Sequence, residues 1–167
     1  FKDYRELLSK GVEAVSIAVP TKLHYEVALF FIRNNVHVLV EKPISDDVGK
    51  AWELIREAER SNVILLVGHI ERYNPVVKRL KEEVKNGVLG EIITMSAKRI
   101  GPFDPRVSDV SIIIDLAIHD IDVMNYILEE YPLKVFARGR RIHEKSLTED
   151  YALIHLLYAS GVDGLIE

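Results

Sequence analysis

Residues 14–19 read AVSIAV, residues 36–40 read VHVLV and residues 63–67 read VILLV. Each is a short apolar run rich in β-branched residues, which is typical of a strand buried on both faces of a sheet. Helical patterns of ordinary length separate the three runs. This alternation predicts βαβ units with a parallel sheet, and right-handed crossovers place the carboxyl ends of the strands along one edge. Ligands of such sheets bind at that edge.

Both separating helices show apolar residues at helical spacing. The first follows Pro20-Thr21, and its predicted apolar face consists of Val27, Ala28, Phe31 and Ile32. The second is predicted over residues 46–60, with Trp52, Ile55 and either Ala58 or Glu59 on its inner face.

The second half of the chain has a different pattern. A helix is predicted over residues 75–85, where Asn86-Gly87 ends it, and another within the apolar stretch 111–130. A loop is predicted over residues 101–106. Residues 91–99 alternate like a half-exposed strand, and the remaining strands, expected to form an antiparallel sheet, cover residues 133–141, 151–158 and 164–167. We therefore predict two domains, residues 1–70 and residues 71–167.

Composition restricts the class of protein. The 167 residues are 48% hydrophobic and 29% charged, which suits a folded domain with a substantial core. The net charge of −4 argues against a nucleic-acid partner, and no apolar run reaches membrane-spanning length. The absence of cysteine excludes disulfides and thiolate metal sites. We expect a cytoplasmic protein with a small-molecule partner.

Three segments carry a family resemblance: residues 15–21 (VSIAVPT) together with His24, residues 38–43 (VLVEKP) and residues 115–122 (DLAIHDID). In this order and spacing they resemble the glucose–fructose oxidoreductase, inositol dehydrogenase and rhizopine catabolism family, written Gfo/Idh/MocA. Residues 68–75 (GHIERYNP) are similar to members that act on nucleotide-linked amino sugars.

The resemblance implies a Rossmann dinucleotide-binding domain followed by an α+β domain with an open, mostly antiparallel sheet. It implies NAD or NADP as the cofactor. The family opens with a G-x-G-x-x-G turn, which holds the dinucleotide pyrophosphate at a helix N-terminus, and this motif is absent from the 167 residues. We therefore expect a chain truncated at both ends, inactive by itself, that keeps the nicotinamide end of the site.

Lys42 is the first candidate catalytic residue. It follows a predicted strand directly, and an ammonium group at that edge can stabilise negative charge on a reacting hydroxyl. The alternative is that Lys42 is an ordinary surface lysine, exposed to solvent and without a catalytic role.

Asp115 and His119 are the other two candidates. They are four residues apart and share a face if one helix contains both. His119 can accept the proton of an alcohol, with Asp115 orienting its ring or binding a neighbouring hydroxyl. Two alternatives remain: a helix start with a capping aspartate, best represented by Asp120, and a metal site built from Asp115, His119 and Asp122.

The resemblance also implies the residues around these three. The candidate cofactor-binding residues are Pro20, Thr21, His24, Glu41, Lys42 and Pro43, with a cis peptide expected at Pro43. The candidate substrate-binding residues are Arg72, Tyr73, Asn74 and Arg99, although a salt bridge is the commoner fate of an arginine.

The expected function is hydride transfer between nicotinamide and a secondary hydroxyl of a sugar or sugar nucleotide, with C3 of a UDP-N-acetylhexosamine as the best substrate. A binding remnant without catalysis and a metal-dependent hydrolase are the alternatives. In the strand over residues 151–158, apolar side chains alternate onto both faces, so neither face is simply polar. This pattern predicts an open sheet with an apolar face, and a homodimer or homotetramer through it.

Overall fold

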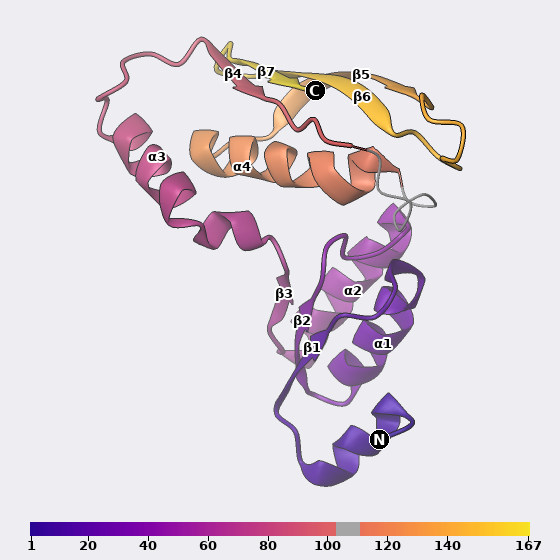
Figure 1. Ribbon diagram of the computed structural model, residues 1–167. Helices are drawn as coiled ribbons and strands as arrows, with labels where there is room; N and C mark the ends of the chain where they lie inside the picture. Colours follow the sequence, from indigo (N-terminus) through magenta and orange to yellow (C-terminus); the bar gives the residue numbers. More distant parts are fainter. Residues whose placement is uncertain (103–110) are drawn as a thin grey trace. The chain divides into compact units, whose positions relative to one another are not determined.

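The computed structural model describes residues 1–102 and 111–167, so the end of the predicted loop at 101–106 lies outside the described residues. The chain divides into two compact units, Phe1–His69 and Ile70–Glu167 (Figure 1). Among the described residues, no helix has both the length and the apolar character needed to cross a bilayer.

The first unit is a three-stranded parallel sheet in the order β1-β2-β3. Its elements are η1 (Tyr4–Lys10), β1 (Ala14–Ile17), α1 (Thr21–Arg33), β2 (His37–Val40), α2 (Val48–Ser61) and β3 (Leu65–Val67). Local signals set the bounds of α2. Asp47 caps its start by accepting a hydrogen bond from the Lys50 N–H, and Asn62 ends it in the left-handed conformation with φ of 52°.

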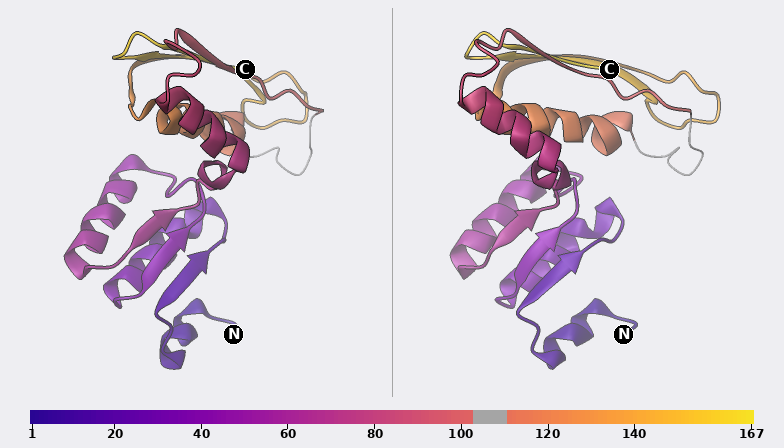
Figure 2. Two further views of the ribbon diagram at one scale, coloured as in Figure 1. Left: turned by 90° about the vertical axis from the view of Figure 1, so that its left-hand side faces the viewer. Right: turned by 60° about the vertical axis from the view of Figure 1, so that its left-hand side comes forward.

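Helices α1 and α2 both cover the same face of this sheet (Figure 2). Two successive right-handed crossovers between adjacent strands necessarily place both helices on one side. The predicted apolar face of α1 is confirmed, since Val27, Ala28, Phe31 and Ile32 are all buried.

Two expectations about this core are wrong. The strands are not buried on both faces: Val38 and Val40 are buried beneath the helices, whereas Leu66 of β3 is 42% exposed. In α2, Trp52 is 56% exposed and Leu54 takes the fully buried position instead. The strands are exposed on one side because only the face of the sheet that carries α1 and α2 forms the core, whereas in α2 the inward face runs through Leu54 and Ala58.

The second unit contains a four-stranded sheet in the order β4-β7-β6-β5. Its elements are η2 (Ile70–Tyr73), α3 (Pro75–Lys85), β4 (Thr94–Ala97), the π-helical turn η4 (Ile113–Ala117), α4 (Ile118–Leu128), β5 (Pro132–Arg140), β6 (Tyr151–Tyr158) and β7 (Asp163–Ile166). The predicted bounds of α3 and β6 match those observed. Strands β5, β6 and β7 pair antiparallel, as expected, while β4 joins β7 in parallel.

Helix α4 covers one face of this sheet, as Figure 1 shows. Ala117 and Met124 pack with Ile154, Leu156 and other side chains of the covered face. Gly164 allows the close approach, since a Cβ there would lie 3.0 Å from the Met124 sulfur. The expected open sheet with a helix over one face is confirmed. The other face is mixed rather than simply apolar, since Phe136, Leu153 and Leu165 are exposed there among charged side chains such as Arg138 and Asp163.

Candidate functional site

The carboxyl edge of the first sheet gathers the residues that follow its strands. Main-chain hydrogen bonds extend the ladder past the strand ends: the Glu41 N–H donates to the Ile17 carbonyl at 3.0 Å, and the Gly68 N–H donates to the Val40 carbonyl at 2.8 Å. Pro20 caps α1 and Thr21 is its first residue. The candidate cofactor residues of this unit therefore occupy one edge, as parallel strands require.

Glu41 lies directly against Gly68. The Glu41 Oε2 atom accepts a hydrogen bond from the Lys42 N–H at 3.3 Å. A Cβ added to Gly68 would lie 3.1 Å from that same oxygen and 3.3 Å from the Glu41 Cα atom. Gly68 is therefore needed for the Glu41 side chain to lie where it does. Gly68 was not among the predicted site residues, although a glycine directly after a strand often marks a close backbone approach.

Lys42 and Pro43 form the turn that leaves this edge. Lys42 is half-buried, and the expected cis peptide between Lys42 and Pro43 is present. His24 of α1 is 1% exposed, with Nδ1 at 2.7 Å from the Pro43 carbonyl oxygen and Nε2 at 2.8 Å from the Val19 carbonyl oxygen. The His24 ring thus joins the turn after β1 to the turn after β2.

In the second unit, α4 and the preceding π turn present two opposite stripes. The stripe that packs in the core with the sheet consists of Ile113, Ala117, Ile121, Met124 and Leu128. Asp115, His119, Asp122 and Tyr126 are spaced four, three and four residues apart and form the stripe on the other side.

Asp115 lies within the π turn rather than in a regular α-helix, which corrects the assumption of a single α-helix through both residues. A π turn contains more residues than an α turn, so a spacing of four comes closer to one full turn. Asp115 and His119 therefore remain on one side. Asp120 does not cap the helix: Ala117 occupies the N-cap position without a side-chain hydrogen bond.

Arg72 of η2 is bound to this second stripe. Its Nε and Nη2 donate to the two carboxylate oxygens of Asp122 at 2.8 and 2.6 Å, and its guanidinium lies 5.5 Å from the centre of the Tyr126 ring. The hydrogen bonds that Arg72 donates to Asp122 raise the pKa of Arg72 above its ordinary value, and partial burial opposes this shift. The bidentate pair therefore fixes η2 on α4, one helical turn from His119.

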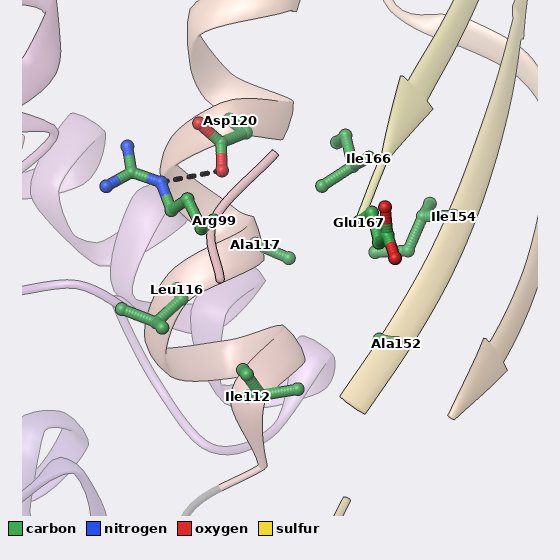
Figure 3. A pocket seen from close by; sticks show the side chains of 9 residues that line it. All are labelled: Arg99, Ile112, Leu116, Ala117, Asp120, Ala152, Ile154, Ile166 and Glu167. Carbon is green, nitrogen blue, oxygen red and sulfur yellow. Dashed lines mark hydrogen bonds and ion pairs between the residues drawn. The ribbon is translucent and has the colours of Figure 1, made fainter. Parts of the chain in front are cut away.

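Arg99, just after β4, is held by Asp120 at 2.7 Å through its Nε atom (Figure 3). This hydrogen bond raises the pKa of Arg99, with partial burial again opposing the shift. The terminal guanidinium nitrogens point away from Asp120 in Figure 3. Arg99 is also one of the residues that line a small, mainly apolar pocket between the start of α4 and the sheet, together with Ala117, Ile154 and Ile166.

The two remaining candidates have different surroundings. Asn74 caps α3 by accepting from the Val76 N–H at 3.0 Å, and its amide donates to Glu71 at 3.0 Å. Tyr73 is 63% exposed, with the Lys78 ammonium 5.2 Å from its ring centre. His155 was not among the predicted site residues; its Nε2 lies 2.6 Å from Asp163 on the uncovered face of the second sheet.

Lys42 belongs to the first unit, whereas Asp115 and His119 belong to the second. The structure thus groups the candidates into two sets, and the meeting of Lys42 with Asp115 and His119 stays a prediction.

Known families match both units. Residues 1–69 match the family described as "Oxidoreductase family, NAD-binding Rossmann fold", and residues 77–167 match the "GFO/IDH/MocA C-terminal domain". This chain belongs to the GFO/IDH/MocA family. Its first unit is therefore a Rossmann domain of an NAD-binding class, and the expected fold class is confirmed.

Several relatives of this chain are named as dehydrogenases. The chain is 37% identical to a UDP-N-acetylglucosamine 3-dehydrogenase of Acidithiobacillus ferrooxidans, over 80% of the chain and 42% of that protein. It is 32% identical to a myo-inositol 2-dehydrogenase of Thermotoga maritima, over 100% of the chain and 53% of that protein. A solved probable dehydrogenase from Thermotoga maritima superposes with a TM-score of 0.88 at 31% identity, covering 99% of this chain and 53% of that one. The chain thus spans about half the length of the curated relatives it matches.

The metal-site alternative does not fit the structure. Among residues 1–102 and 111–167, no three histidine or carboxylate side chains gather as metal ligands. Both oxygens of Asp122 accept hydrogen bonds from Arg72, so this carboxylate is already occupied by an ion pair with an arginine. The proposed trio of Asp115, His119 and Asp122 is therefore wrong as a metal site.

Proposed function

We propose that this chain is part of an NAD-dependent dehydrogenase that oxidises a secondary hydroxyl of a sugar or sugar nucleotide, or catalyses the reverse reaction. The observation that carries the proposal is the position of Lys42, two residues after β2 at the carboxyl edge of a parallel sheet, within a family of NAD-binding oxidoreductases. Ligands of open parallel sheets bind at that edge.

The nicotinamide cofactor supplies the hydride acceptor, and the residues of this chain supply position and proton transfer. Lys42 donates a hydrogen bond to the reacting hydroxyl oxygen and stabilises the negative charge that develops on it. His119 accepts the proton that the hydroxyl releases. Asp115, on the same stripe of the helix, orients the imidazole or binds the adjacent hydroxyl.

The first unit fits the nicotinamide end of the cofactor. Its three strand ends lie side by side, and the missing side chain of Gly68 lets Glu41 pack closely against the backbone that follows β3. Pro20, Thr21, Glu41, Lys42 and Pro43 would line the cofactor there. The 167 residues contain no G-x-G-x-x-G motif, so none of these residues is assigned to the pyrophosphate.

The proposed substrate is a UDP-linked N-acetylhexosamine, oxidised at C3 of the sugar. Similarity to the UDP-N-acetylglucosamine 3-dehydrogenase supports it, and so does Arg99. Asp120 holds Arg99 through Nε, and among the described residues no further side chain accepts a hydrogen bond from its two terminal nitrogens, which can bind a phosphate or carboxylate. Similarity to the myo-inositol 2-dehydrogenase over the whole chain favours a cyclitol as the second candidate.

The test measures NADH formation by the intact protein with NAD⁺ and either UDP-N-acetylglucosamine or myo-inositol. Lys42→Met and His119→Gln should each lower kcat by about 100-fold or more, since each removes an acid–base or charge-stabilising group. Lys50→Met is the matched control, because Lys50 is a lysine of the same unit paired with Asp46 on the surface. Unchanged turnover in Lys42→Met and His119→Gln would refute these roles. NAD⁺ binding without oxidation of any sugar or cyclitol would favour the binding remnant.

We further propose that two copies of the chain associate through the uncovered face of the second sheet. Phe136 of β5, Leu153 and Leu157 of β6 and Leu165 of β7 are exposed there, beside a shallow groove of about 360 Å³. An apolar face of this kind is commonly covered by a partner.

The charges on this face favour one arrangement of the two copies. By the strand register, β5 places Lys134, Arg138 and Arg140 at one edge, while Asp163 and Glu167, which pair with His155 and Lys98, lie toward the other edge. A two-fold axis parallel to the strands would stack the basic edge of each copy over the acidic edge of its partner. An axis across the strands would stack cations on cations, which is unfavourable.

A further inference from the structure

His24 is a buried residue whose two ring nitrogens both face carbonyl oxygens. The distances, 2.7 Å from Nδ1 to the Pro43 oxygen and 2.8 Å from Nε2 to the Val19 oxygen, are those of true hydrogen bonds. A carbonyl oxygen only accepts hydrogen bonds. A neutral imidazole carries a proton on one nitrogen and a lone pair on the other, so it can serve only one of these two carbonyls.

We propose that His24 is an imidazolium that donates to both carbonyls and thereby positions Lys42. A neutral ring would place a nitrogen lone pair against a carbonyl lone pair at hydrogen-bond distance, inside a site that is 1% exposed. Buried polar atoms with no compatible partner are strongly disfavoured in proteins. The doubly protonated ring satisfies both acceptors, and charge-assisted hydrogen bonds compensate for part of its desolvation.

The two carbonyls belong to the two turns that form the carboxyl edge of the sheet. Val19 follows β1, and Pro43 follows Lys42 after β2. With a donor to each, His24 fixes the distance between these turns and so the backbone position of the residue next to Pro43. His24 thus acts through Lys42 as a positioning residue. Its effect on catalysis rests on the proposed function, whereas the protonation of its ring is independent of that function.

His37 provides a contrast within the same unit. Its Nδ1 accepts a hydrogen bond from the Ile64 N–H at 3.0 Å, so that nitrogen carries no proton. His37 lies at the first residue of β2, at the end of the strand opposite to Lys42. Two histidines of one unit should therefore differ in ring state at the same pH.

The first test is ¹⁵N NMR of the histidine rings in the 167-residue chain at neutral pH. His24 should show two protonated, slowly exchanging ring nitrogens, and His37 should show an unprotonated Nδ1. Loss of the corresponding signals in His24→Phe and in His37→Phe assigns them. A single protonated nitrogen on His24 would overturn the proposal, whatever the enzyme's activity.

The second test separates positioning from mere stability in the intact protein. With UDP-N-acetylglucosamine and NAD⁺, His24→Phe should lower kcat about tenfold or more with a smaller change in KM, since small displacements of a catalytic group are costly. His24→Gln, which retains one donor, should recover part of the loss, and His37→Phe should leave kcat unchanged. Equal effects of His24→Phe and His37→Phe would refute the positioning role. Absence of turnover in the unsubstituted protein would count against the proposed function and leave the NMR result standing.

Discussion

At the scale of single residues, two predicted substrate-binding arginines of the second unit are bound to specific carboxylates, Arg72 to Asp122 and Arg99 to Asp120. Arg72 and Asp122 are fifty residues apart in sequence, yet they form a bidentate pair in which the Asp122 side chain is only 9% exposed. The fork of a guanidinium matches a carboxylate in a way that a lysine ammonium cannot. The binding of Arg72 to substrate stays a prediction, whereas its attachment of η2 to α4 is observed.

The Arg72–Asp122 pair should contribute measurably to stability. We expect Arg72→Lys to lower the free energy of unfolding of the second unit by about 1–2 kcal/mol, a value discounted because the Arg72 side chain is 40% exposed. Arg79→Lys is the control, since Arg79 pairs with Glu83 on the surface of α3 and is 72% exposed; it should change stability by no more than about 0.5 kcal/mol. Urea unfolding monitors both. Equal losses in the two variants would contradict a special role for the pair.

At the scale of elements, one carboxylate organises the connection between β5 and β6. Asp150 accepts hydrogen bonds from the Ile142 N–H at 2.6 Å and the His143 N–H at 2.8 Å. These bonds favour the ionised carboxylate, and they lower the pKa of Asp150 below its ordinary value of 3.8, the Ile142 bond most strongly. The ionised carboxylate of Asp150 thus holds the connection between β5 and β6, and strong acid removes its charge by protonation.

The pH dependence of this connection follows from the direction of the shift. A carboxylate with a lowered pKa in the folded state stabilises it fully above the ordinary pKa and loses that effect as pH falls through the lowered value. We expect the amide signals of Ile142 and His143 to titrate together in NMR with a midpoint below 3.8, and Asp150→Asn to abolish the titration. A midpoint at or above 3.8 would show that the two hydrogen bonds do not favour the ionised form.

At the scale of the whole molecule, the uncovered face of the second sheet should govern association. Leu165→Asp places a charge in the apolar centre of that face and should weaken the dimer, because an unpaired charge is costly to bury. Val76→Asp is the control, since Val76 is 72% exposed on α3, away from the sheet. Sedimentation of the intact protein over a range of concentrations measures the effect. A monomer at all concentrations before substitution would refute the dimer, and equal weakening by both variants would place the interface elsewhere.

The sequence by itself determined the order and type of most elements, because periodicity and capping are local properties. The bounds of α3 follow from a proline at its start and Asn86-Gly87 at its end, and those of β6 from an alternating run. The expected cis peptide at Pro43 was likewise carried by a motif of consecutive residues.

Only the tertiary structure decided which residues meet. It paired Arg72 with Asp122 and Arg99 with Asp120, joined β4 to β7 in parallel, and exposed Trp52 while burying Leu54. It also set the ring of His24 between two carbonyls from separate turns. These contacts depend on the paths of distant segments and on which face of a sheet receives the helices. Local periodicity specifies a buried face, but the partner of that face is fixed only when the chain folds.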